Sequence, residues 1–113
     1  MKIISDKITL SELTQIAGEM FGNFIKAVVD VDRELMAIDA ELHSDLEAML
    51  LAQGAKQKDL WGINLYPAMP GDELIEFDSM INMRPSQGNR SRGVENEETR
   101  RKIMAIVAKR IIR

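Results

Sequence analysis

Residues 84–93 concentrate the side chains that are best suited to binding an anion. This 84–93 loop holds three arginines, two serines, a glutamine, an asparagine, two glycines and a proline. Arginine presents forked N–H donors that match phosphate and carboxylate oxygens, and glycine lets a ligand approach the backbone closely. We therefore expect a binding module for a small anionic or phosphate-bearing ligand. The expected ligand-binding residues are Arg84, Ser86, Gln87, Asn89, Arg90 and Arg92.

The same arginines also allow a structural interpretation. They could bridge to carboxylates of the same chain, such as Glu76 and Asp78, and fix the loop onto the domain. Both interpretations stay open at the level of the sequence. The spacing of Gly88 and Gly93 matches that of a phosphate-binding P-loop. However, Val94-Glu95 stands where that motif requires Lys and Ser/Thr, so we reject the match.

A second hypothesis is an enzyme that acts on such a ligand, with His43, Asp45 or Asp78 as the acid–base group. His43 is the only histidine, and carboxylates flank it in "DAELHSDLE". A histidine oriented by a carboxylate can act as a general base near neutral pH. The structural alternatives are that His43 only packs or hydrogen-bonds locally, and that Asp78 orients Arg84.

The sequence predicts no metal and no cofactor. There is one histidine and no cysteine, which leaves only an oxygen-rich magnesium or calcium site, and no EF-hand spacing occurs. No serine-hydrolase elbow, zinc motif or dinucleotide-binding fingerprint is present either.

Composition predicts one globular domain over residues 1–113. The chain is 45% hydrophobic and 29% charged, and a chain of this length can bury a core without disulfides. The charged start "MKIISDKITL" does not read as a secretory signal. No run of about 18 apolar residues occurs, so we expect no membrane partner and a cytoplasmic location.

Charge is distributed unevenly along the chain. Residues 1–83 carry 6 Lys/Arg against 15 Asp/Glu, whereas residues 84–113 carry 9 against 3. The basic end could pair with the acidic remainder of its own fold, or with a second copy in a homodimer, which is our third hypothesis. Nucleic acid is an unlikely partner because the pI is near 5.2 and the few aromatic residues fit core positions.

Three helices are expected from capping and periodicity. A capping box of Thr9 and Glu12 opens a helix over residues 10–21, and a similar box of Ser44 and Glu47 predicts a second helix up to residue 53. A strand remains the alternative for this second segment, because its three adjacent apolar residues fit both. Asn96 caps a third helix, which has an acidic first turn and a basic end.

The strands follow from alternating and β-branched residues. We expect strands over residues 24–31, 34–39 and 59–67, and over residues 73–84 as one long strand or as two joined at Asp78-Ser79. Gly62 within the third of these strands marks either a close backbone approach or an ordinary core position beside Trp61. The predicted fold is α+β, with three helices packed against one face of a mainly antiparallel sheet of three to five strands.

Three segments together resemble a known family. "ELHSDLEAMLLAQG", "KQKDLWGINLYP" and "IEFDSMINMRPSQGNRSRGV" are similar to an uncharacterised family of small prokaryotic proteins, a domain of unknown function. The WGINLYP … INMRPSQGNRSRGV pattern is the most specific part of the resemblance, which extends over nearly the whole chain. The resemblance directs attention to residues 84–93 and to His43, and it implies no reaction, ligand or partner.

Overall fold

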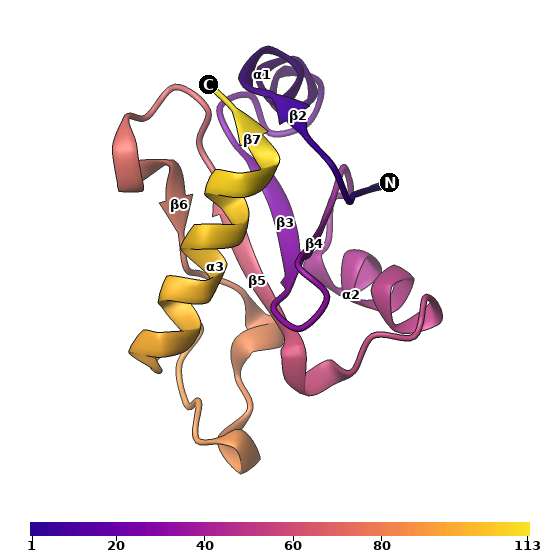
Figure 1. The fold of residues 1–113 in the computed structure, drawn as a ribbon, viewed down its shortest axis with the longest axis vertical. Helices are drawn as coiled ribbons and strands as arrows, with labels where there is room; N and C mark the ends of the chain where they lie inside the picture. The colour runs from indigo at the N-terminus through magenta and orange to yellow at the C-terminus, as the bar shows by residue number, and fades with distance from the viewer.

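A five-stranded antiparallel sheet forms the centre of the molecule, and a computed structural model describes all residues 1–113. In spatial order the strands are β1 (Lys2–Ile4), β4 (Leu35–Ile38), β3 (Ile25–Asp30), β5 (Leu60–Leu65) and β6 (Ile75–Glu76) (Figure 1). A parallel pair, β2 (Ile8–Thr9) and β7 (Ile111–Ile112), joins the two ends of the chain. The predicted α+β fold with a mainly antiparallel sheet is confirmed. None of the helices has the length and apolar character needed to cross a membrane.

The three helices begin close to where the sequence places them. In α1 (Leu10–Glu19) the hydroxyl of Thr9 accepts from the backbone N–H of Glu12 at 3.1 Å. In α3 (Glu97–Arg110) the side chain of Asn96 accepts from the N–H of Thr99 at 2.9 Å. These two caps satisfy amides that the first helical turn leaves without partners, so both predictions are confirmed.

The cap predicted for the second helix is wrong. Helix α2 (His43–Ala52) begins at His43, and its N-cap residue Leu42 offers no side-chain hydrogen bond to the first turn. Ser44 therefore lies inside the helix. The imidazole of His43 binds the carbonyl of Ile63 in β5 at 2.8 Å. This bond ties the first helical residue to the sheet, and the helix starts two residues earlier than a cap at Ser44 would place it.

Helices cover both faces of the sheet, which corrects the expectation that they pack on one face (Figure 1). Ile25, Ala27 and Val29 of β3 belong to the larger core with α1 and α3, whereas Val28 packs with α2 in a smaller core. Successive side chains of a strand point to opposite faces. In the strand "IKAVVD" one side is apolar at Ile25, Ala27 and Val29, and the other carries the fully buried Val28 between Lys26 and Asp30, so each face has apolar surface to cover.

Neither form of the strand expected over residues 73–84 is correct, whether one long strand or two strands joined at Asp78-Ser79. Strand β6 ends at Glu76, and the chain then forms a single 3₁₀ turn, η3 (Met80–Asn82). The hydroxyl of Ser79 accepts from the backbone N–H of Ile81 and opens this turn. A short polar residue that hydrogen-bonds its own backbone competes with strand pairing, which alternation of apolar residues does not register.

Candidate functional site

Side chains of residues 78–92 occupy the free edge of β5 where β6 has ended. The carboxamide of Asn82 accepts from the N–H of Gly62 at 2.8 Å and donates to the carbonyl of the same residue at 2.9 Å. It thus reproduces both hydrogen bonds that a neighbouring strand residue would make. Asn64 donates to the carbonyl of Asp78 at 3.3 Å one step further along. The segment closes an edge that would otherwise expose unpaired backbone groups.

Gly62 allows this close approach. A Cβ atom built at Gly62 would lie 2.5 Å from the Cβ of Ser79 and 2.6 Å from its hydroxyl oxygen. Real Cβ atoms do not approach side chains so closely. Of the two interpretations that the sequence left open, close backbone approach is therefore confirmed.

Arg84 acts as a clasp within the fold. Its guanidinium donates to the carbonyls of Gln57 and Leu60 and lies over the ring of Trp61, 4.3 Å from the ring centroid. Only 9% of the residue is exposed, and burial lowers the pKa of the guanidinium from its usual value. Its donors face the protein, so few remain for a ligand.

Asn89 is a second internal anchor of the loop. Its amide nitrogen donates to the carbonyls of Asn82 at 2.7 Å and Gly93 at 2.8 Å, and its amide oxygen accepts from the N–H of Glu95 at 2.9 Å. Its backbone pairs with that of Arg84 in an isolated bridge. The loop is shaped by these internal bonds.

The remaining predicted ligand residues point in different directions. Ser86 and Arg90 are exposed, and Gln87 donates to the carbonyl of Lys58 at 3.3 Å. The carboxylate of Glu95 accepts from the N–H groups of Arg90 and Ser91, and these backbone bonds hold the pKa of Glu95 below its usual value. The six residues do not converge on one point.

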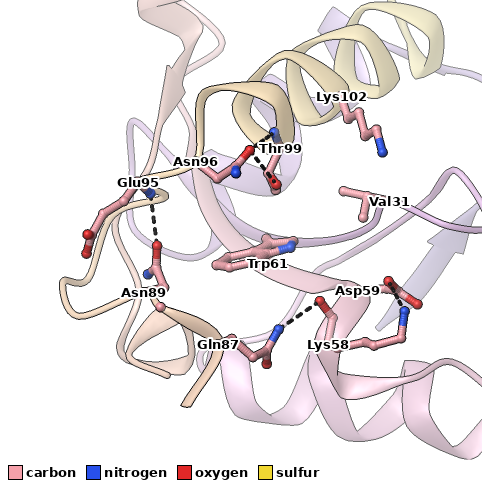
Figure 2. Close-up of a pocket in the computed structure, with 11 residues that line it drawn as sticks. Val31, Lys58, Asp59, Trp61, Gln87, Asn89, Glu95, Asn96, Thr99 and Lys102 are labelled. Carbon is pink, nitrogen blue, oxygen red and sulfur yellow. Dashed lines mark hydrogen bonds and ion pairs between the residues drawn. The ribbon is translucent and has the colours of Figure 1, made fainter. Parts of the chain in front are cut away.

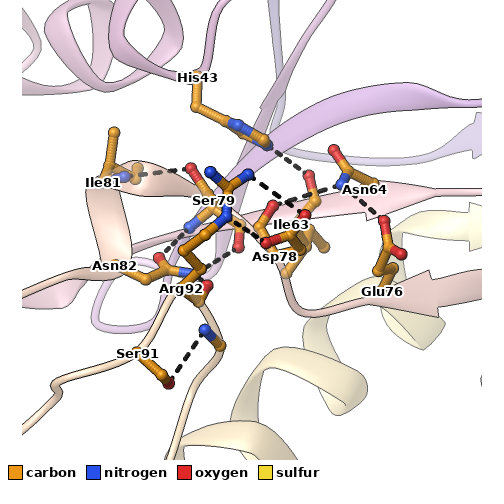
Figure 3. A network of polar contacts seen from close by, with 12 residues as sticks. His43, Ile63, Asn64, Glu76, Asp78, Ser79, Ile81, Asn82, Ser91 and Arg92 are labelled. Atoms are coloured by element: carbon orange, nitrogen blue, oxygen red, sulfur yellow. Dashed lines mark hydrogen bonds and ion pairs between the residues drawn. The ribbon is translucent and has the colours of Figure 1, made fainter.

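Arg92 stands apart, since it lies with Asp78 and His43 on the α2 side of the sheet (Figure 3). Its Nε donates to Asp78 at 2.6 Å and one Nη donates to the other carboxylate oxygen at 3.3 Å. This pairing lowers the pKa of Asp78 and raises that of Arg92. The second Nη makes no hydrogen bond within the chain, so one side of the guanidinium keeps free donors.

His43 presents one nitrogen to the same place. Its Nε2 is 2.8 Å from the carbonyl of Ile63, and a carbonyl can only accept, so Nε2 carries the proton. Nδ1 then bears a lone pair when the ring is neutral, and no group of the chain donates to it. The residue is 8% exposed, and desolvation lowers its pKa from the usual value, so the ring is neutral at pH 7.

A cavity of about 160 Å³ joins these groups. Lys26 from β3 and Arg92 supply positive charge, and Ser44 and Ser79 line it as well. Leu42 and His43 place the start of α2 at the cavity. Because Leu42 provides no cap, the first amides of a ten-residue helix lack a side-chain acceptor there. The complete lining is Lys26, Leu42, His43, Ser44, Ser79, Met80, Ile81 and Arg92.

A larger cavity of about 590 Å³ lies on the α3 side, with Trp61 between Thr99 and Gln87 in Figure 2. Its polar groups already have partners within the chain. Lys58 pairs with Asp59 at 3.2 Å, and Asn96 caps α3. Glu95 binds loop amides, as described above. The smaller cavity instead brings together His43 and Arg92, whose Nδ1 and second Nη make no hydrogen bond within the chain, so we regard it as the candidate site.

Sequence reasoning named three residues of this cluster and missed others. His43 and Arg92, which line the cavity, were named, and so was Asp78, which pairs with Arg92; neither Asp45 nor Asp78 lines the cavity itself. Lys26 was missed, although a lysine that interrupts an apolar strand is a signal that the sequence offers. Nothing in the sequence marks Asn82 as an anchor. No three His, Cys, Asp or Glu side chains come together to hold a metal ion.

Comparison with known proteins gives one match. The family model described as "Protein of unknown function (DUF5674)" matches residues 2–110. No curated protein and no solved structure matches the chain. Because the family model spans nearly the whole chain, the resemblance seen in the sequence is confirmed, and the chain belongs to the DUF5674 family of proteins of unknown function.

Proposed function

We propose that the protein binds a small anion, a carboxylate or a phosphate, in the cavity between the start of α2 and Arg92. The observation that carries the proposal is the uncapped helix start at Leu42, which faces free donors of Arg92 and the charge of Lys26 across one small cavity. Of the residues expected from the sequence to bind a ligand, the proposal keeps Arg92, and it gives Arg84 a structural role.

Three kinds of donor support anion binding here. The free Nη of Arg92 offers charged N–H groups, and charge-assisted hydrogen bonds to oxyanions are about twice as strong as neutral ones. The first turn of α2 adds backbone N–H groups and the positive end of the helix dipole. Nδ1 of His43 can join them once it is protonated.

Asp78 limits the strength of the site. Its carboxylate already neutralises part of the charge of Arg92. Asp78 also orients the guanidinium, because a bidentate pair fixes both the position and the plane of an arginine. We therefore expect selective binding of modest affinity, in which a ligand oxygen lies on the side of Arg92 that faces away from Asp78.

Thermal unfolding with added sulfate, phosphate and acetate tests the proposal. A ligand at ten times its dissociation constant stabilises the native state by about 1.4 kcal/mol. This corresponds to a rise of roughly 5 °C in Tm for a domain of this size. Arg92→Gln should abolish the rise, since it removes the charged donors and keeps a polar side chain.

Arg90→Gln is the matched control. Arg90 lies in the same loop two residues away, its side chain is exposed, and it does not line the cavity. The control should keep the full rise in Tm. Equal loss in both variants would mean that anions act on the general charge of the loop and would contradict the proposed site.

A second candidate function is acid–base catalysis on the bound anion. It is favoured by the free Nδ1 of His43, which is neutral at pH 7 and faces the same cavity as Arg92. In this role Nδ1 takes a proton from the ligand or from a water molecule beside it. Asp78 is held ionised by Arg92 and would position that arginine without transferring a proton itself.

Release of nitrophenolate from 4-nitrophenyl phosphate, whose phosphate group is anionic, tests this candidate. His43→Gln should abolish release and keep sulfate binding, whereas Arg90→Gln should keep both. The absence of release by the unchanged protein would remove hydrolysis of phosphate esters and would leave anion binding in place.

The homodimer and the cytoplasmic location stay predictions. Sedimentation at low and high salt tests the dimer, because association of a basic end with an acidic surface weakens as ions screen it.

A further inference from the structure

We infer that the ligand is an amphipathic anion, in which the carboxylate or phosphate is attached to a short aliphatic or aromatic group. The inference rests on the proposed function and specifies its ligand class. It follows from the apolar side chains at the mouth of the cavity, which an inorganic anion would leave unused.

Two large apolar side chains lie exposed at this cavity. Leu42 is 54% exposed and Met80 is 63% exposed, and both line it together with the half-buried Ile81. Single exposed apolar residues are common on protein surfaces. Here they gather at a cavity whose other lining is cationic or polar. Such a division, with a polar group at one end and an apolar wall at the other, is typical of small-molecule sites.

Leu42 is also the wrong residue for its local position. The N-cap of a helix favours Asn, Asp, Ser or Thr, and leucine is among the poorest choices. Leu42 has the extended backbone of an N-cap, and its carbonyl accepts from the N–H of Asp45 at 3.2 Å, but its side chain can accept no hydrogen bond from the turn. One residue thus leaves the helix amides open to an anion and places an apolar side chain beside them. A ligand with both characters would use both features.

The backbone around both side chains is fixed. His43, which follows Leu42, is tied to β5 through Ile63. Met80 opens η3, which is anchored by the two hydrogen bonds between Asn82 and Gly62. The apolar wall is therefore built into the fold, and the two side chains stay on the same cavity.

The volume limits the size of the ligand. A cavity of about 160 Å³ is close to the roughly 150 Å³ of an engineered cavity that holds benzene. It accommodates a carboxylate or phosphate group with about three or four carbon atoms. A longer chain would extend past Leu42 and Met80 into solvent and would gain little.

A homologous series of acids tests the inference. We would titrate acetate, propionate, butyrate and valerate, and inorganic phosphate against propyl phosphate, following the backbone and ring resonances of His43 by NMR. Each added methylene should tighten binding roughly fourfold as it leaves water, until the cavity is full. Propyl phosphate should bind more tightly than inorganic phosphate. The carboxylate and phosphate arms distinguish the two possible head groups.

Variants assign the effect to the apolar wall. Leu42→Ala and Met80→Gln should flatten the dependence on chain length and leave the affinity for inorganic phosphate unchanged. Met83→Gln is the matched control. Met83 lies in the same segment and is 45% exposed, but it does not line the cavity, so its variant should keep the full dependence.

The outcomes separate this inference from the proposed function. Binding of inorganic phosphate with no gain along the series would overturn the inference and keep the anion site. Binding of no anion at all would overturn both. A chain-length gain that persists in Leu42→Ala and Met80→Gln would place the apolar contact elsewhere and overturn the inference as well.

Discussion

Arg84 and Arg92 lie eight residues apart in one loop, yet they occupy opposite environments. Arg84 is buried, stacks on Trp61 and gives its donors to backbone carbonyls. Arg92 is half exposed, pairs with a carboxylate and keeps one Nη free beside a cavity. The difference lies in the partner. The backbone carbonyls that bind Arg84 occupy its N–H donors, whereas the exposed carboxylate of Asp78 orients Arg92 and leaves one Nη without a partner.

The sharpest test of this comparison is the stability of two matched variants. Arg84→Met should lower the free energy of unfolding by about 3 kcal/mol, because it leaves the carbonyls of Gln57 and Leu60 without their donor. Arg92→Met should unfold close to the wild-type denaturant concentration, as expected when an exposed ion pair is removed. Urea titration measures both, and equal losses would refute the distinction.

Gly62→Ala should have the next largest effect on the free energy of unfolding. The new methyl group would collide with Ser79, so either the β5 edge or the 78–82 segment must move, at a cost of about 2 kcal/mol. Because Ser79 also lines the cavity, anion binding should weaken in the same variant. Gly18→Ala is the control, since its Cβ meets nothing within 4 Å. A fully stable Gly62→Ala protein would contradict the close approach.

Leu42→Asn should separate stability from binding. Asparagine at this N-cap can accept from the first turn of α2, which should raise the free energy of unfolding by about 1 kcal/mol. The same hydrogen bond occupies amides that we assign to the ligand, so anion binding should weaken. Thermal unfolding with and without sulfate measures both changes. A variant that gains stability and keeps full binding would remove the helix start from the site.

Acidification should destabilise the protein by a smaller amount, because it protonates the carboxylates that hold the 84–93 loop. The pKa values of Glu95 and Asp78 are lowered in the folded protein below 4.5 and 3.8, the values of the free groups. Their stabilisation is therefore complete above pH 5, begins to be lost as the pH falls below 4.5, and is lost fully once the pH has fallen through the lowered pKa values of the folded protein. Urea titrations at pH 6 and pH 3.5 should show that Glu95→Gln loses less stability on acidification than the wild type. An identical loss in both proteins would contradict the role of Glu95.

The sequence predicted the elements whose signals are local. The caps at Thr9 and Asn96 and the strands around residues 25–30 and 60–65 follow from nearby residues, and the structure agrees. The failures concern contacts between distant segments. The start of α2 depends on a bond to Ile63, twenty residues away, and β6 stops because Asn82 takes over the edge of β5.

The candidate site could be predicted from the sequence only in part, because residue types are local information and their contacts are not. Arginine, histidine and aspartate suggest chemistry by type alone, so His43, Asp78 and Arg92 could be named. Arg84 faces carbonyls because it packs against Trp61, and Arg92 faces the cavity beside α2. The spacing of the arginines in the sequence does not predict this difference. Lys26 became relevant only once β3 had placed it beside His43.

The most direct test of the anion site is the pKa of His43, measured by NMR with and without sulfate. Sulfate keeps its charge across the range, and the groups that face the ring are Lys26, Asp78 and Arg92. In the free protein burial keeps this pKa below 6.5, and a bound anion beside Nδ1 should raise it, so sulfate should bind more tightly as the pH falls from 7 to 5. A His43 pKa that sulfate leaves unchanged would contradict the account.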